Sequence, residues 1–129
     1  MAIYPTDYKY TRGHEWVRVD GGTATVGITE FAQKQLGDMV FVDVPTVGRT
    51  VETGEPFGTV ESVKSVSDLF MPVGGKVVAM NEELSDEPEL LNSEPHEAWV
   101  IKIQVTDKAA LKELLSADQY EKYLASEAD

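Results

Sequence analysis

One lysine stands where its side chain could support chemistry. Lys64 separates two stretches rich in β-branched residues, in the run Val60-Glu61-Ser62-Val63-Lys64-Ser65-Val66-Ser67-Asp68. A lysine at the tip of a β-hairpin projects into solvent on a flexible stem, where an enzyme could acylate its amine. Such an amine can anchor a long cofactor arm, because tethering gives a high effective concentration at each site that the arm visits. By spacing alone, an exposed lysine between strands is more often a solvated surface residue.

Short β-strands are the elements expected to position this lysine. Alternating apolar and polar residues predict strands, and glycine or proline between them marks turns. The predicted strands cover 14–19, 23–28, 39–44, 57–63, 65–70, 76–81 and 99–105, with turns and short strands over 46–56. Many short strands at regular spacing predict a sandwich or barrel, in which Lys64 lies between two strands.

Helical segments are fewer. Thr29 is a suitable N-cap for a short helix over 30–36, and Gly37 supplies its end. The acidic stretch 82–97, which holds two prolines, predicts an irregular loop with one helical turn.

The C-terminal tail is predicted to be helical in two pieces. Asp107 caps the first, and Ser116 caps the second with Gln119 at the capping-box position. No linker or repeat divides the chain. We therefore expect one domain over 1–129, with a core of about 8–106 and a C-terminal helical segment of about 107–125.

Composition narrows the classes of function. The formal net charge is −12, from 11 basic and 23 acidic residues, and such a surface disfavours nucleic-acid and membrane-surface roles. The absence of cysteine excludes disulfides and thiolate chemistry, and His14 and His96 are too few for a histidine-rich metal site. The N-terminal segment lacks a signal or import pattern, so we expect a soluble cytoplasmic protein.

The residues around Lys64 also match a motif. Glu61-Ser62-Val63-Lys64-Ser65-Val66-Ser67-Asp68, followed by Pro72-Val73-Gly74-Gly75, resembles the lipoylation motif of glycine cleavage H proteins, which usually reads E-S-V-K-A-x-S-D and S-P-[VI]-S-G. Further similar segments are His14-Glu15-Trp16-Val17, Gly27 to Gln33 with Leu36-Gly37-Asp38, Val40-Phe41-Val42, Pro45 with Gly48, Pro88 to Asn92, and Trp99 to Lys102. The resemblance extends over roughly residues 8 to 124.

The resemblance implies a fold, a cofactor and a role. The fold would be mainly β, a hybrid barrel-sandwich of two antiparallel sheets with short helices and a C-terminal helical tail. Lipoate would be held in amide linkage on Lys64, attached by a lipoate ligase or a lipoyl/octanoyl transferase. The chain would be a non-catalytic carrier without a metal, because the redox chemistry belongs to the cofactor.

The implied partners are three enzymes. A pyridoxal-phosphate glycine decarboxylase would load an aminomethyl group onto the lipoyl sulfur. A tetrahydrofolate-dependent aminomethyltransferase would take the methylene carbon, and dihydrolipoamide dehydrogenase would reoxidise the dithiol.

Three carboxylates are candidates for contacts with this arm. Glu61 and Asp68 correspond to acidic residues that flank the family lysine, so they are candidates for recognition by the lipoylating enzyme or for pairing with the aminomethyl ammonium. Glu15 is a further candidate for pairing with that ammonium. The alternative, which we weigh equally, is that Glu15 is only a polar residue on a half-exposed strand. We expect structural roles for His14, Trp16 and Trp99, with both tryptophans in the core.

The chain departs from the family pattern in three places. Segment 93–99 is one residue shorter than usual and lacks two glycines. We expect this segment to lie near the resting cleft of the arm, so its contacts there should differ from those of the family. Gln35 stands where some members have histidine, so any role of that ring is lost. Gly74 replaces a serine, which we expect to be harmless.

Other assignments compete with this one. A biotin carrier usually has M-K-M and a lipoyl domain of a 2-oxoacid dehydrogenase D-K-A, whereas this chain has V-K-S. The H-E-W strand and the helical tail argue against both. An H-like protein that donates lipoyl groups to other proteins and an unmodified structural or interaction domain stay open. A stand-alone enzyme is disfavoured, because no nucleophile–base pair is apparent.

Overall fold

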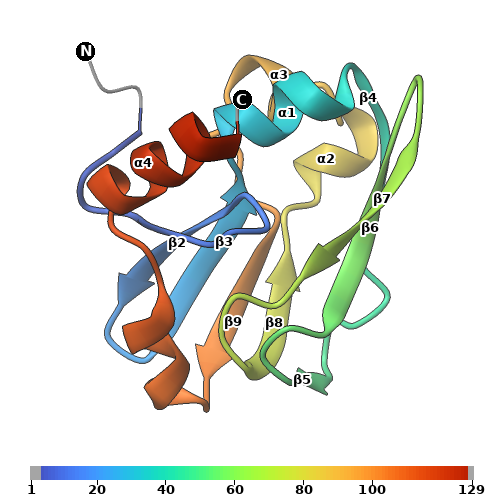
Figure 1. Cartoon of the computed structure of the whole chain (residues 1–129). Coiled ribbons are helices and arrows are strands. Elements are labelled where there is room, and N and C mark those ends of the chain that lie inside the picture. Colours follow the sequence, from blue (N-terminus) through green and yellow to red (C-terminus); the bar gives the residue numbers. More distant parts are fainter. Residues whose placement is uncertain (1–3, 128–129) are drawn as a thin grey trace.

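Short antiparallel strands form two sheets that face each other (Figure 1). The computed structural model describes residues 4–127. Its strands are β1 (Lys9–Tyr10), β2 (Glu15–Asp20), β3 (Thr23–Ile28), β4 (Met39–Asp43), β5 (Thr50–Val51), β6 (Pro56–Ser62), β7 (Val66–Phe70), β8 (Gly75–Met80) and β9 (Ile101–Val105). The larger sheet has the order β1-β2-β3-β9-β8-β5 and the smaller β4-β6-β7. The predicted mainly β fold with two antiparallel sheets is confirmed, and neither sheet closes into a barrel within these residues.

The hairpin of β2 and β3 is built around one large side chain. Trp16 pairs with Gly27 across the hairpin, and a Cβ at position 27 would lie 2.5 Å from the indole carbons. Only glycine therefore leaves room for the ring. Trp16 is fully buried, as expected from the sequence, and its Nε1 donates to the carbonyl of Pro95 at 2.7 Å.

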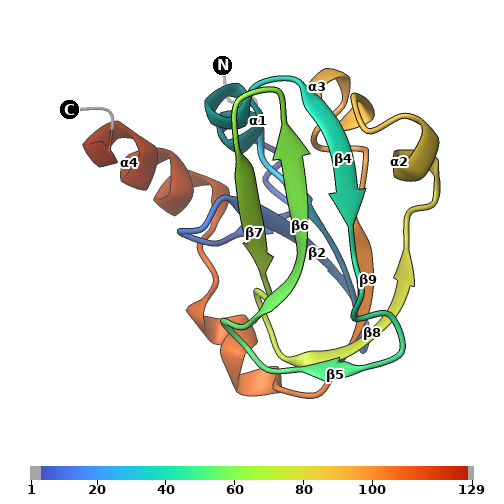
Figure 2. The ribbon, with the colours of Figure 1, turned by 90° about the vertical axis from the view of Figure 1, so that its right-hand side faces the viewer.

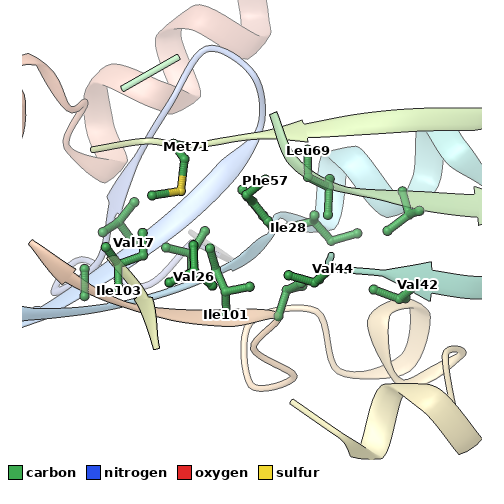
Figure 3. Close-up of a cluster of buried hydrophobic side chains, with 14 of the residues drawn as sticks. Val17, Val26, Ile28, Val42, Val44, Phe57, Leu69, Met71, Ile101 and Ile103 are labelled. Atoms are coloured by element: carbon green, nitrogen blue, oxygen red, sulfur yellow. The ribbon is translucent and has the colours of Figure 1, made fainter. Parts of the chain in front are cut away.

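The hydrophobic core fills the space between the sheets. Figure 3 shows Phe57, Leu69 and Met71 on the side of the smaller sheet, facing Val26 and Ile101 on the larger one. All five are buried. Full burial of such a side chain contributes about 1.5–3 kcal/mol, so this cluster holds the two sheets together.

The hairpin of β6 and β7 carries Lys64 at its tip, near the top of Figure 2. Glu61 pairs with Val66 across the hairpin. Val60 is buried in the core, and side chains alternate along a strand. Glu61 and Val66 therefore lie on the outer face of the small sheet, and both are exposed.

Helix α1 (Glu30–Leu36) forms as predicted. The Thr29 hydroxyl accepts a hydrogen bond from the backbone N–H of Ala32 at 3.2 Å, so it is the expected N-cap. Gly37 ends the helix with a φ of 85°, a conformation that favours glycine.

The stretch 82–97 contains two short helices, so the prediction of one helical turn was wrong. Helix α2 (Glu83–Asp86) and helix α3 (Leu90–Ser93) are separated by a segment that contains Pro88, whose ring cannot donate a backbone hydrogen bond. Leu84 and Leu91 are fully buried and anchor the two helices in the core. Tertiary burial therefore stabilises helices that local sequence alone does not specify.

The tail is helical in two pieces, as predicted. The Asp107 carboxylate accepts a hydrogen bond from Ala110 N–H and begins η1 (Lys108–Glu113), which is a 3₁₀ helix. Helix α4 (Ala117–Glu127) begins with the predicted capping box. There the Ser116 hydroxyl accepts from Gln119 N–H at 3.2 Å, and the Gln119 side chain accepts from Ser116 N–H at 2.9 Å.

Two details of the sheet differ from expectation. Strand β1 was not predicted, and its Tyr10 also bridges to Leu115 ahead of α4. Strand β9 begins at Ile101, so Trp99 precedes it and is only half-buried, with the Lys102 ammonium 4.9 Å from its ring centroid. The prediction that Trp99 is a core residue is thus only partly right. No helix in the described part of the chain is long and apolar enough to cross a bilayer.

Candidate functional site

A serine hydroxyl organises the turn that presents Lys64. The Ser62 hydroxyl oxygen accepts from the backbone N–H of Ser65 at 3.2 Å and from that of Lys64 at 3.4 Å. Ser62 N–H donates to the Ser65 carbonyl at 2.8 Å, and Val63 N–H donates to the Asp38 carbonyl at 2.9 Å. Every backbone N–H from residue 62 to 65 is therefore bound, and the tip is an ordered turn.

The Lys64 side chain is exposed, and its stem passes over the end of helix α1. A Cβ at Gly37 would lie 3.1 Å from Lys64 Cε. Glycine at this position therefore serves two purposes: it permits the positive φ and leaves room for the lysine stem. The stem of Lys64 therefore passes close to the protein surface, while the residue stays open to solvent.

Asn92 joins helix α3 to this region. Its side-chain oxygen accepts from Met39 N–H at 2.8 Å, and its amide nitrogen donates to the Gly37 carbonyl at 2.9 Å and to the Gln33 side chain at 3.1 Å. These three bonds fix the connection between α1 and β4 that supports both Gly37 and the Lys64 turn.

A small cavity opens beside the hairpin. Its volume is about 160 Å³. We call it the hairpin cavity; it is lined by Gly13, His14, Ile28, Ala32, Gln35, Leu36, Ser67, Asp68 and Leu69. One wall is the loop before β2, a second is α1, and the third is β7. The lining combines apolar residues with polar ones, among them Gln35 and Asp68.

A second cavity adjoins the first at Gly13 and continues along β7. We call it the Glu15 cavity; its volume is about 370 Å³ and its lining includes Glu15, Phe70, Met71 and Leu114. The two cavities share Gly13 and are lined by the adjacent β7 residues Leu69 and Phe70, and we refer to the pair as the furrow.

Glu15 lies at the floor of this furrow. It is 3% exposed, so the interpretation of a half-exposed strand residue is wrong. Burial raises the pKa of its carboxyl above the usual value, while hydrogen bonds from the Thr11 hydroxyl and the Phe70 backbone N–H lower it. The site thus holds a buried carboxyl that an arriving cation would stabilise in its charged form.

The other two candidate carboxylates both belong to exposed positions of the small sheet, where Glu61 pairs with Val66 and Asp68 pairs with Thr59. Asp68 is exposed and lines the hairpin cavity. Glu61 does not line it; it lies on the outer face of the small sheet between Phe41 and Val66, both exposed. With Val63 at the hairpin tip, the outer face next to Lys64 is an apolar surface that carries a negative charge.

The shortened segment 93–99 packs against β2 and the start of α1. The Pro95 carbonyl accepts from Trp16 Nε1, the His96 carbonyl from the Tyr8 hydroxyl, and His96 Nε2 from Glu30 N–H at the start of α1. None of its residues lines the hairpin cavity. The expectation that this segment lies near the resting cleft of the arm stays a prediction, whereas the substituted Gln35 lines the hairpin cavity.

The sequence prediction missed four residues that shape the site. Three of them, Ser62, Gly37 and Asn92, stand inside segments that match the family motifs. The match therefore pointed to these positions but did not reveal what their side chains do. The fourth is Tyr120 of α4, whose hydroxyl lies 2.8 Å from His14 Nδ1 and 2.7 Å from the Thr29 hydroxyl. The structural role expected for His14 fits these contacts.

Comparison with known proteins bears on this arrangement. The family described as Glycine cleavage H-protein matches residues 8–127. The Glycine cleavage system H protein of Acidobacterium capsulatum is 53% identical over 124 residues, which are 96% of each chain. That of Carboxydothermus hydrogenoformans is 50% identical over 130 aligned positions, covering 100% of each chain. The crystal structure of a glycine cleavage system H protein from Mycobacterium marinum superposes with a TM-score of 0.84 at 39% identity, covering 98% of this chain and 100% of that one.

Proposed function

The chain belongs to the glycine cleavage H-protein family, and from this premise we propose that Lys64 carries its lipoate as a covalently attached arm. Members of this family are lipoyl-carrying, non-catalytic subunits of the glycine cleavage system. The observation that carries the proposal for Lys64 is its setting: an exposed side chain on an ordered turn, followed by a strand, β7, that lines a cavity.

The hairpin cavity suits the end of such an arm. A cavity of about 150 Å³ holds a benzene-sized group, and this one has about 160 Å³ beside apolar side chains of Ile28, Leu36 and Leu69. A dithiolane ring is an apolar group of comparable size. The residues present therefore fit lipoate, and Lys64 is the residue that holds it.

The bound dithiol supplies the chemistry of receiving and releasing an aminomethyl group. In the proposed cycle Lys64 would hold a lipoyl group that could accept an aminomethyl group at the glycine decarboxylase, give its methylene carbon to the aminomethyltransferase with release of ammonia, and be reoxidised by dihydrolipoamide dehydrogenase. The relatives are bacterial, and we propose that the cycle takes place in the cytoplasm.

The chain's own residues shelter and orient this cargo. Asp68 at the hairpin cavity and Glu15 deeper in the furrow are the carboxylates placed to accept hydrogen bonds from the cargo ammonium. Charge-assisted bonds of this kind are about twice as strong as neutral ones. The buried Glu15 is the stronger partner, because a charge pair out of water is less screened than one at the surface.

Glu61 has a different proposed role. It lies outside the furrow, on the apolar outer face next to Lys64. We assign it to recognition by the lipoylating enzyme, whose complementary surface would be apolar with a basic side chain opposite Glu61.

The direct test of the proposed carrier role is Lys64→Arg, which keeps a long cationic side chain and removes the amine. In a reconstituted glycine cleavage assay we expect no turnover and an unchanged thermal midpoint, because the exposed side chain contributes little to the core. Lys76→Arg, at an exposed lysine of the larger sheet, is the matched control and should be fully active. Turnover by Lys64→Arg at the wild-type rate would reject the proposal in favour of an unmodified domain. Lipoylation without turnover by the wild type would favour a lipoyl donor.

A further inference from the structure

Helix α4 does not line the hairpin cavity, but one of its side chains reaches two of the cavity's walls. Tyr120 is fully buried. Its hydroxyl is 2.8 Å from Nδ1 of His14 and 2.7 Å from the hydroxyl of Thr29. The hydroxyl thus joins the loop before β2 to the start of α1.

The two partners of this hydroxyl set the shape of the cavity. His14 lines it directly and has a φ of 71°, a left-handed conformation that a non-glycine residue keeps only when its surroundings impose it. Thr29 caps α1 through Ala32, which lines the cavity from the opposite wall. The backbone N–H of Thr29 also donates to the His14 carbonyl at 3.0 Å, and the phenol oxygen adds a side-chain link between the same two walls.

The ring of Tyr120 has a separate role from its hydroxyl. It stacks on Tyr10 with a centroid separation of 4.9 Å and an interplanar angle of 9°, and it meets the ring of Tyr4 edge-on at 5.2 Å. These contacts dock α4 against the larger sheet, and phenylalanine at position 120 would keep them. The hydroxyl can therefore be tested without undocking the helix.

We propose that Tyr120 is a positioning residue for the arm: through its hydroxyl, α4 braces the loop wall and the helix wall of the hairpin cavity so that the cargo on lipoyl-Lys64 is sheltered from water. This inference rests on the proposed function. It gives the C-terminal helix a part in cargo retention although the helix is outside the cavity.

The chemistry that the brace opposes is loss of the cargo to water. Hydrolysis takes up one water and breaks both the sulfur–methylene and the methylene–nitrogen bonds, and it yields the free thiol, formaldehyde and ammonium. The rate of this loss reports how well the cavity excludes water. A wall that relaxes by one ordinary hydrogen bond should increase the rate about fivefold.

The test compares Tyr120→Phe with Tyr10→Phe. Both variants remove one buried hydroxyl from the same stacked pair, but the Tyr10 hydroxyl donates to the Pro5 carbonyl at 2.6 Å, away from the cavity walls. The carrier is lipoylated, reduced and loaded with formaldehyde and ammonium, and ammonium release is followed in the absence of partner enzymes. We expect release about fivefold faster for Tyr120→Phe and at the wild-type rate for Tyr10→Phe.

A second measurement uses the protein without lipoate. Nitrogen-15 spectra should show shifts of the His14 ring nitrogens and of amides 13–15 and 30–36 in Tyr120→Phe, but not in Tyr10→Phe. Equal release rates for the two variants, or unchanged cavity resonances in Tyr120→Phe, would overturn the inference and leave Tyr120 a packing residue. If Lys64 accepts no lipoate, the proposed function fails, and the spectra still decide whether the hydroxyl holds the two walls.

Discussion

At the scale of single residues, the buried carboxyl of Glu15 has the most direct physical consequence. Burial raises the pKa of this carboxyl in the folded protein above its ordinary value of 4.5. The folded state therefore binds the proton more tightly than the unfolded state. This contribution to stability is fully present below the unfolded pKa and is lost as pH rises through the folded pKa.

We predict that Glu15→Gln gains stability relative to the wild type as pH rises from about 4 towards neutral, because glutamine does not ionise. Urea unfolding at a series of pH values measures the difference in free energy of unfolding. Replacing the hydrogen bonds of the carboxyl costs the same free energy at every pH. This cost shifts the plot of the stability difference against pH without changing its slope. A flat curve would show that Glu15 titrates normally in the fold, and the opposite slope would show that its pKa is lowered.

Residue identity alone predicted part of the site. Lys64 and Asp68 lie where the motif indicated, because a hairpin fixes residues that are close in sequence. Sequence did not predict that Glu15 is buried or that Glu61 faces away from the cavity. Those facts depend on which face of each strand meets the second sheet, and on the Phe70 N–H that reaches Glu15 from another strand.

At the scale of elements, helix α1 is the one that connects the Lys64 stem, the hairpin cavity and the C-terminal helix. Its seven residues are too few for a stable isolated helix. Its stability must therefore come from its caps and its contacts, and Thr29 is the residue where both meet.

We predict that Thr29→Ala lowers the free energy of unfolding by about 1–2 kcal/mol, the usual cost of losing an N-cap. The side chain is fully buried, so no water can replace its hydroxyl. Thr29→Ser keeps the hydroxyl and should recover most of the loss in urea unfolding. Equal destabilisation by alanine and serine would mean that the methyl group, rather than the cap, is what the site requires.

Elements with local signals were predicted well from the sequence. The caps at Thr29, Asp107 and Ser116 depend on residues three positions apart, so the sequence displays them directly. Strand β1 and the second short helix in 82–97 escaped prediction because they are stabilised by distant partners. The two residues of β1 pair with β2 and with Leu115.

At the scale of the whole molecule, the surface is strongly acidic, and exposed apolar residues lie next to Lys64. The net charge of −12 attracts any basic partner from a distance. Recognition at the lysine should depend instead on the local charge of Glu61 among Phe41, Val63 and Val66.

We predict that Glu61→Gln lowers the kcat/KM of enzymatic lipoylation severalfold. Glu52→Gln is the matched control, since it removes one charge from an exposed residue after β5, at the end of the molecule opposite the hairpin (Figure 2). Both variants have the same net charge, so the long-range electrostatic attraction of a basic partner is reduced equally in the two. Equal small losses would assign the effect to net charge and remove Glu61 from the recognition surface.

The most direct measurement of the central claim is the intact mass, with peptide mapping, after incubation with a lipoate ligase, ATP and lipoate. We predict one added lipoyl group on the peptide that contains Lys64 and none on the Lys64→Arg variant. Absence of the group on folded protein, while a control carrier is modified, or its presence on another lysine, would contradict the assignment of Lys64 as the carrier residue.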